Sequence, residues 1–126
     1  MTFVDTNVLM YAVGREHPLR AEARAFFERS LISSEPLVTS AEVLQELLHA
    51  YVAAGRLDTL DAALALARAC IPTVWSVEFE DVELARLLVD RHSGLAARDL
   101  LHVACCTRRN VTRIHTFDRG LAAAIG

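Results

Sequence analysis

Short apolar runs alternate along this chain with longer stretches of helical periodicity. The short runs cover residues 2–4, 37–38, 73–77 and 113–117, and they have the length of extended segments. Between them, apolar residues recur every three or four positions, which is the spacing of one helix face. The helices predicted from this spacing cover about residues 7–13, 18–31, 40–54, 57–69, 96–108 and 120–125. A further helix is predicted around residues 84–88 and ends near residues 93–94.

Extended segments that alternate with helices indicate a parallel sheet covered by helices on both faces. At 126 residues the chain is long enough for one hydrophobic core and too short for two. We therefore expect one α/β domain over residues 1–126. In open sheets of this kind, ligands bind beyond the carboxyl ends of the strands.

Two aspartates directly follow extended segments of the predicted sheet. Asp5 comes after residues 2–4, and Asp118 comes after residues 113–117. If these two strands are neighbours, both carboxylates point into the same crevice. Each aspartate could equally be the N-cap of the helix that follows it. The sequence leaves both roles open for each residue.

A third aspartate, Asp99, lies in the first turn of the helix predicted over residues 96–108, which is apolar almost all round. Such a helix is usually buried on more than one side. An unpaired charge on a buried helix is costly. A bound metal ion, a salt bridge to Arg98 or the helix dipole could each compensate it.

The helix predicted over residues 40–54 offers Glu42 and Glu46 as further acids. Thr39 and Glu42 have the spacing of a capping box, which would account for Glu42 structurally. Glu46, one turn later, lies nearer the apolar stripe of the helix. We therefore favour Glu46 as the fourth acidic member of the site.

Four carboxylates in one crevice would repel one another unless a cation neutralises them. Ligation by oxygen alone favours Mg²⁺ or Mn²⁺ over zinc. Zinc between His102 and Cys106 is a weaker alternative, because no second pair of ligands accompanies them. The chemistry that such a site favours is metal-assisted attack of water on a phosphodiester.

Composition narrows the remaining choices. The net charge of −3 argues against a large basic surface for nucleic acid but not against local contacts. All thirteen basic residues are arginine, so no mechanism can use a lysine. Three cysteines without C-x-x-C spacing indicate a reducing compartment, and no apolar run approaches membrane-spanning length. We therefore expect a cytoplasmic protein.

Four segments of the chain together resemble the PIN-domain ribonucleases, and most closely the VapC toxins of bacterial toxin–antitoxin systems. They are residues 4–9 (VDTNVL), 39–46 (TSAEVLQE), 97–102 (ARDLLH) and 116–119 (TFDR). The resemblance implies a three-layer α/β/α PIN-like sandwich. Family members usually carry another strand after the last aspartate, so we expect a sheet whose C-terminal edge strand is missing, or a truncated chain.

The resemblance also implies a Mg²⁺- or Mn²⁺-dependent endoribonuclease that a VapB-type antitoxin neutralises and that pairs as a homodimer. Asp5 and Asp99 would be the principal metal ligands, and Asp118 would complete the site directly or through water. Glu46 would bind through water or steer the nucleophile.

Neighbouring residues receive supporting roles from the same resemblance. Thr6, Asn7 and Thr116 would orient the carboxylates, although Thr6 and Asn7 could also cap the first helix. Arg98 and Arg119 flank predicted ligands and are expected to contact RNA phosphates. We expect His102 to pack or to support a ligand rather than to act as a general base.

Two other readings remain as alternatives. A PIN-like scaffold could bind a partner without cutting RNA. A phosphorylated receiver domain is also a parallel α/β unit, but it would need paired acids after the first strand and a lysine, which this chain lacks.

Overall fold

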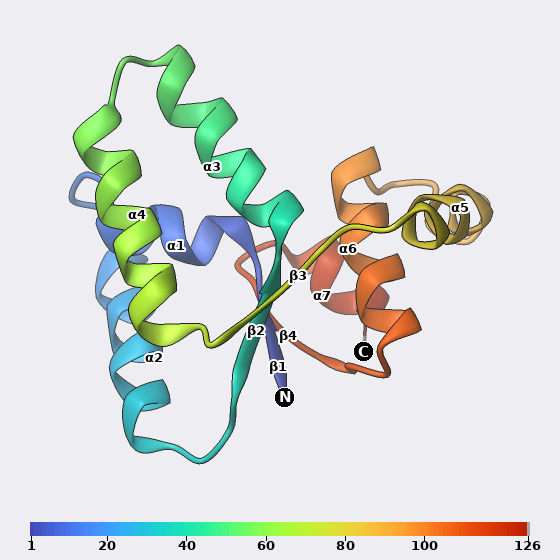
Figure 1. Ribbon diagram of the computed structural model, residues 1–126, viewed down its shortest axis with the longest axis horizontal. Coiled ribbons are helices and arrows are strands. Elements are labelled where there is room, and N and C mark those ends of the chain that lie inside the picture. Colours follow the sequence, from blue (N-terminus) through green and yellow to red (C-terminus); the bar gives the residue numbers. More distant parts are fainter. Residues whose placement is uncertain (126) are drawn as a thin grey trace.

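The computed structural model describes residues 1–125, and its centre is a four-stranded parallel sheet (Figure 1). The strand order is β3-β2-β1-β4, so the first and last strands in sequence are neighbours. Phe3 of β1 pairs with Val38 of β2 on one side and with Ile114 of β4 on the other. The strands are β1 (Thr2–Val4), β2 (Leu37–Ser40), β3 (Thr73–Trp75) and β4 (Arg113–His115).

Within residues 1–125, seven helices cover the two faces of the sheet. Figure 1 shows helices on both sides of the sheet, which confirms the three-layer α/β/α sandwich. No helix among residues 1–125 is long and apolar enough to cross a bilayer. The first side carries α1 (Thr6–Val13), α2 (Arg20–Ile32), α3 (Ala41–Ala53) and α4 (Leu57–Cys70), and the second carries α5 (Phe79–Leu88), α6 (Ala97–Arg108) and α7 (Arg119–Ile125).

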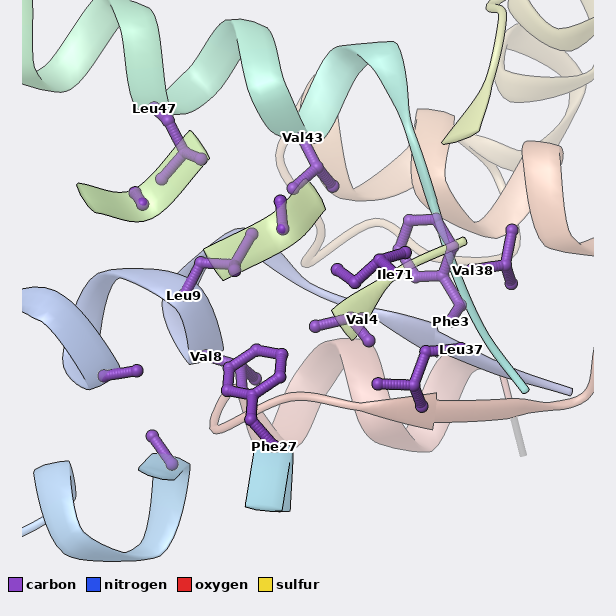
Figure 2. Packing of buried hydrophobic residues seen from close by; sticks show 14 of the residues in the cluster. Phe3, Val4, Val8, Leu9, Phe27, Leu37, Val38, Val43, Leu47 and Ile71 are labelled. Carbon is purple, nitrogen blue, oxygen red and sulfur yellow. The ribbon is translucent and has the colours of Figure 1, made fainter. Parts of the chain in front are cut away.

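The main core lies between the sheet and the helices α1 to α4. Val4, Val8 and Leu9 are completely buried there (Figure 2). Phe3 is also completely buried and lies beside His102 of α6, so β1 is covered on both faces. On the other face, α6 lies against the sheet, α5 and α7. Its residues 102–106 are all buried, which confirms that this apolar helix is covered on more than one side.

The predicted capping box at the start of α3 is wrong. Strand β2 extends to Ser40, which pairs with Trp75, and this pairing keeps Thr39 extended. The Thr39 hydroxyl donates to the Val4 carbonyl (2.8 Å) instead of capping the helix. Ser40 is the N-cap, and its hydroxyl accepts from the amide of Val43 (3.4 Å).

The end of the sheet is formed by β4. Within residues 1–125 no strand follows α7, and β4 is an edge strand of the sheet. The sequence predicted a sheet of this kind, without a further strand after the last aspartate. Strand β4 ends at His115, two residues earlier than predicted, because the amide of Phe117 donates to the side chain of Asn7 (3.2 Å). This contact turns the chain toward the acidic residues.

Candidate metal and active site

Asp5 lies at the carboxyl end of the central strand β1 and is only 5% exposed. Its backbone amide donates to the His115 carbonyl of β4 (3.1 Å). One carboxylate oxygen accepts from the Thr6 amide (2.7 Å) and thereby caps α1, and the other accepts from the Thr116 hydroxyl (2.7 Å). Asp5 therefore has both predicted roles, since it caps α1 and also lines the acidic crevice. Burial raises the pKa of Asp5, and the hydrogen bond from Thr116 opposes that rise.

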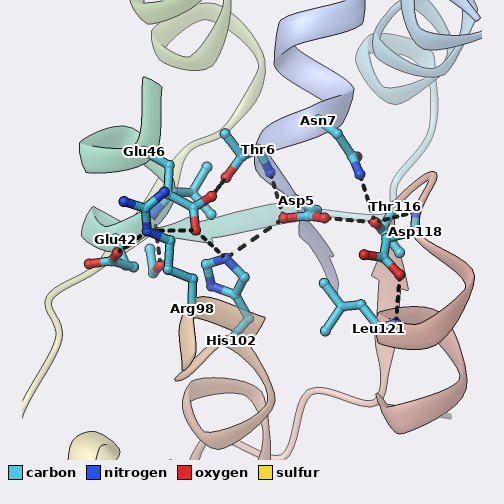
Figure 3. Close-up of polar contacts among 12 residues, drawn as sticks. Asp5, Thr6, Asn7, Glu42, Glu46, Arg98, His102, Thr116, Asp118 and Leu121 are labelled. Carbon is cyan, nitrogen blue, oxygen red and sulfur yellow. Dashed lines mark hydrogen bonds and ion pairs between the residues drawn. The ribbon is translucent and has the colours of Figure 1, made fainter. Parts of the chain in front are cut away.

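The Thr116 hydroxyl joins three groups around Asp5 (Figure 3). It donates to Asp5 Oδ2, accepts from Asn7 Nδ2 (3.2 Å) and accepts from the Asp118 amide (3.0 Å). Asn7 thus uses its amide nitrogen on Thr116 and its amide oxygen on Phe117. These contacts fix the loop after β4 against the start of α1, so that Asp118 faces the same space as Asp5.

Glu46 reaches this space from α3. The Thr6 hydroxyl donates to its carboxylate, so Thr6 links α1 to α3 rather than capping its own helix. His102 Nε2 lies 3.4 Å from Glu46 Oε1, and Arg98 Nε lies 4.0 Å from the same oxygen. Burial alone would raise the pKa of Glu46, but His102, Thr6 and Arg98 lower it. Glu46 is therefore held as a carboxylate.

Asp99 and Asp118 complete the acidic wall. Asp99, at the start of α6, is half-buried, and its pKa is raised by burial and by the nearby charge of Asp5. Asp118 is exposed, and its Oδ1 accepts from the Leu121 amide (3.1 Å) in the first turn of α7. Both residues line one cavity of about 250 Å³ together with Asp5 and Glu46.

The cavity gathers most of the predicted site residues. Thr6, Asn7 and Arg98 line it, and Thr116 reaches it through Asp5. Arg119 is exposed at the start of α7 and is not among the residues that line the cavity. Glu42 is also outside the cavity lining and lies 3.9 Å from Arg98 Nε. Arg98 therefore approaches the glutamates of α3, and no ion pair between it and Asp99 occurs within residues 1–125.

His102 occupies a more central place than its sequence context indicates. It is completely buried, packs beside Phe3 (ring centroids 5.4 Å apart) and directs Nε2 between Glu46 and Asp5, 3.7 Å from Asp5 Oδ1. Burial alone would lower the pKa of His102, but the carboxylates of Glu46, Asp5 and Asp99 raise it. The sequence signal for this position is the i, i+3 spacing from Asp99, which places both side chains on one face of α6.

Asp5, Glu46 and His102 form a group that could hold a metal ion, since one potential ligand atom from each lies within 4.8 Å of the others. In the described part of the chain, neither ring nitrogen of His102 has a hydrogen-bond partner. An imidazolium between two carboxylates explains this arrangement without a metal, and a neutral imidazole would leave Nε2 available as a ligand.

Three further arginines, near the end of α6 and in β4, lie away from the crevice. Arg108 and Arg109 donate to the buried carboxylate of Asp81 at 2.7 and 2.8 Å and so fasten α6 to α5. Arg113 lies 3.6 Å from Glu35 at the opposite end of the sheet. Arg108 and Arg109 compensate the charge of Asp81, which is completely buried. All three arginines therefore form ion pairs within the protein.

With this geometry in place, comparison with known proteins identifies the class. Residues 2–125 match the family model described as the PIN domain. The chain belongs to the PIN-domain family. Two solved structures share the fold at low sequence identity. VapC20 of Mycobacterium tuberculosis, described as a sarcin-ricin loop cleaving toxin, matches with a TM-score of 0.76 at 20% identity over 98% of this chain and 95% of that one. FitAcB of Neisseria gonorrhoeae matches with a TM-score of 0.66 at 22% identity, over 99% of this chain and 93% of that one.

Sequence relatives refine the placement within the family. The chain is 64% identical to Ribonuclease VapC23 of Mycobacterium tuberculosis over 124 residues, which is 98% of both chains. It is 42% identical to Ribonuclease VapC13 of the same organism over 120 residues, covering 95% of this chain and 92% of that one. It is a VapC-type PIN protein, as its motifs indicated.

Proposed function

We propose that this protein is a metal-dependent endoribonuclease toxin. The observation that carries the proposal is one cavity lined by Asp5, Glu46, Asp99 and Asp118. Two of these acids lie in helices α3 and α6, and the other two follow strands β1 and β4. The relatives that share most of its sequence are named ribonucleases. A fold alone would not define the activity, because one fold supports many functions. The combination of cavity, acids and close relatives supports RNA hydrolysis.

The residues present fit a divalent cation. Burial is the main cause that raises the pKa values of Asp5 and Asp99, and the charge of a neighbouring carboxylate adds to it, that of Glu46 at Asp5 and that of Asp5 at Asp99. The protein alone therefore compensates their negative charges poorly. Asp118 adds an exposed carboxylate at the mouth of the cavity. An oxygen-rich wall of this kind suits Mg²⁺ or Mn²⁺. We assign Asp5 and Asp99 as the principal ligands, with Asp118 completing the set directly or through water.

Glu46 receives a different role from the aspartates. His102, Thr6 and Arg98 surround its carboxylate and keep it ionised. We propose that Glu46 orients the attacking water and accepts the proton that the water loses as its oxygen bonds to phosphorus. The bond from phosphorus to the leaving ribose oxygen breaks, and that oxygen takes a proton from solvent. Mg²⁺ or Mn²⁺, when bound, supplies Lewis-acid stabilisation of the charge that develops on the phosphate oxygens.

The polar neighbours hold these groups in position. Thr116 and the Thr6 amide orient the Asp5 carboxylate, and Asn7 fixes Thr116. Arg98 lines the cavity and is about half exposed, so it can reach an RNA phosphate. Arg119, outside the cavity lining, is proposed only as a peripheral phosphate contact.

We further propose that a VapB-type antitoxin neutralises the protein. An apolar cavity of about 360 Å³ between α1, α2 and α4, lined in part by Val13, Phe27 and Leu31, supports a docking site for an antitoxin segment. A homodimer is supported by the apolar side chains that α5 exposes, Phe79 at 73% and Leu87 at 71%. The free cysteines and the RNA substrate fit the cytoplasm.

The experiment that tests the proposal is RNA cleavage by the intact chain with Mg²⁺, with Mn²⁺ and with EDTA. We expect metal-dependent cleavage that Asp99→Asn reduces by about a hundredfold or more, since a principal ligand is lost. Asp61→Asn, an exposed aspartate on α4, is the matched control and should cleave like the unmodified chain. Cleavage that survives both EDTA and Asp99→Asn would refute the metal-nuclease account. A folded chain that binds RNA or an antitoxin but never cleaves would favour a scaffold.

A further inference from the structure

A second and larger cavity, of about 550 Å³, adjoins the acidic one. Asn7 and Met10 line both cavities, so the two lie side by side along α1. Helices α1, α3 and α4, whose ends surround this space, lie on the same side of the sheet (Figure 1). The remaining lining residues are Tyr11, Gly14, Arg15, Glu16, His17, Tyr51, Ala54 and Arg56.

Planar side chains dominate the walls of this cavity. The rings of Tyr11 and His17 lie 4.6 Å apart at an angle of 36°, and His17 is exposed on its outer side. The guanidinium of Arg56 lies over the ring of Tyr51, 5.7 Å from its centroid. Aromatic rings and guanidinium planes are the surfaces on which unpaired nucleic-acid bases stack.

The charged residues at the rim are of both signs. Arg15 and His17 are exposed, and no ion pair among residues 1–125 involves Arg15. Glu16 is the acidic residue of the rim. An RNA strand that crosses from the acidic cavity would therefore meet Arg15 and Arg56 beside an apolar hollow, which is an arrangement that suits a phosphate next to a base.

We propose that this cavity binds one unstacked base of the RNA strand, adjacent to the phosphodiester held at the acidic cavity. The inference rests on the proposed ribonuclease function. The base stacks against His17 and Tyr11, and Arg15 or Arg56 contacts the neighbouring phosphate. Asn7, the polar residue between the cavities, already uses both ends of its amide within the protein. Recognition therefore depends on stacking and discriminates weakly between bases.

The test is binding of a short fluorescent single-stranded RNA, measured by polarisation with Ca²⁺ in place of Mg²⁺. A set of RNAs, each lacking the base at one position, is compared with the intact strand. We expect one abasic position beside the cleaved bond to weaken binding by about five- to hundredfold, the usual range for loss of one stacked base. The other positions should change it much less.

Variants then assign the base to this cavity. His17→Ala, at an exposed position, should weaken binding of the intact RNA by about fivefold and leave binding of the abasic RNA unchanged. Tyr11→Ala is the stronger second variant, and His92→Ala, between α5 and α6, is the control that should change neither. Equal weakening of the intact and the abasic RNA by His17→Ala would overturn the inference.

Parallel cleavage assays separate this inference from the proposed function. If the chain cleaves RNA in a metal-dependent way but His17→Ala weakens binding of the intact and the abasic RNA equally, the base site alone is overturned. Unchanged RNA binding together with loss of binding to the cognate antitoxin would assign the cavity to the antitoxin and overturn the inference. A chain that neither binds nor cleaves RNA would overturn both proposals.

Discussion

Replacing Thr116 by valine removes one hydroxyl from the centre of the candidate site while keeping the shape of the side chain. That hydroxyl donates to Asp5 Oδ2 at 2.7 Å and accepts from the amide groups of Asn7 and Asp118. Its loss frees the Asp5 carboxylate to rotate and removes an interaction that opposes the burial-driven rise of the Asp5 pKa. Both effects weaken Asp5 as a ligand.

The size of the effect follows from the kind of hydrogen bond that is lost. A hydrogen bond to a charged group contributes about 1.5–3 kcal/mol. Part of this is recovered by water, because Thr116 is half-buried. We therefore expect the affinity for Mn²⁺ and the kcat/KM for RNA to fall about 10- to 100-fold, which is the usual range for a residue that orients a ligand. The free energy of unfolding should fall by about 1–3 kcal/mol, since two donors lose their acceptor.

The assay is Mn²⁺ binding by calorimetry at neutral pH, with RNA cleavage measured on the same preparations. Thr39→Val is the matched control, because the Thr39 hydroxyl is completely buried and donates only to the Val4 carbonyl. It should lower stability by about 1 kcal/mol without a comparable loss of Mn²⁺ affinity. Unchanged Mn²⁺ affinity in folded Thr116→Val, or an equal loss in Thr39→Val, would refute the assigned role of Thr116.

Three further predictions concern the charges. Asp99→Asn should raise the melting temperature of the metal-free chain by about a few degrees at pH 7–8. A carboxyl whose pKa is raised by folding destabilises the folded chain once the pH is above that pKa. An unchanged or lower melting temperature would contradict this prediction. The affinity for Mn²⁺, measured by calorimetry, should weaken as the pH falls through the raised pKa values of Asp5 and Asp99, because binding must then release protons from these carboxyl groups. An affinity that does not change with pH would count against Asp5 and Asp99 as ligands. Asp81→Asn should lower the free energy of urea unfolding by about 2–4 kcal/mol at neutral pH. Because Arg109 and Arg108 hold the pKa of Asp81 well below its usual range, this difference should begin to shrink only below about pH 4 and should continue to shrink as the pH falls toward the lowered pKa; a difference that does not change with pH would refute this.

The arrangement of elements could be predicted from the sequence because each apolar period is long enough to define a helix or a strand. That Asp5 and Asp118 would share a crevice was predicted only on the condition that their strands are neighbours, and the pairing of β1 with β4 meets this condition. Element ends were less certain. Thr39 and Ser40 are both good N-caps, and only the pairing of Ser40 with Trp75 decides that β2 continues through Thr39.

The interior of the site depends on contacts that local sequence does not carry. Thr6 donates to Glu46 forty residues away, and Thr116 donates to Asp5 across the sheet. The burial of His102 between Glu46 and Asp5 arises where α6 packs against β1. Arg108 and Arg109 lie nearly three turns beyond Asp99 along the same helix, and their contacts with Asp81 of α5 likewise arise only from packing.

Diffraction from crystals soaked in Mn²⁺, recorded for its anomalous signal, tests the central claim most directly. The account predicts one strong anomalous peak in the acidic cavity, with carboxylate oxygens of Asp5 and Asp99 as ligands and Asp118 bound directly or through water. The same crystals of Asp99→Asn should lose the peak or show it at much lower occupancy. A chain that cleaves RNA while its cavity shows no peak at saturating Mn²⁺, or a peak held by His102 and Glu46 away from Asp99, would contradict the account.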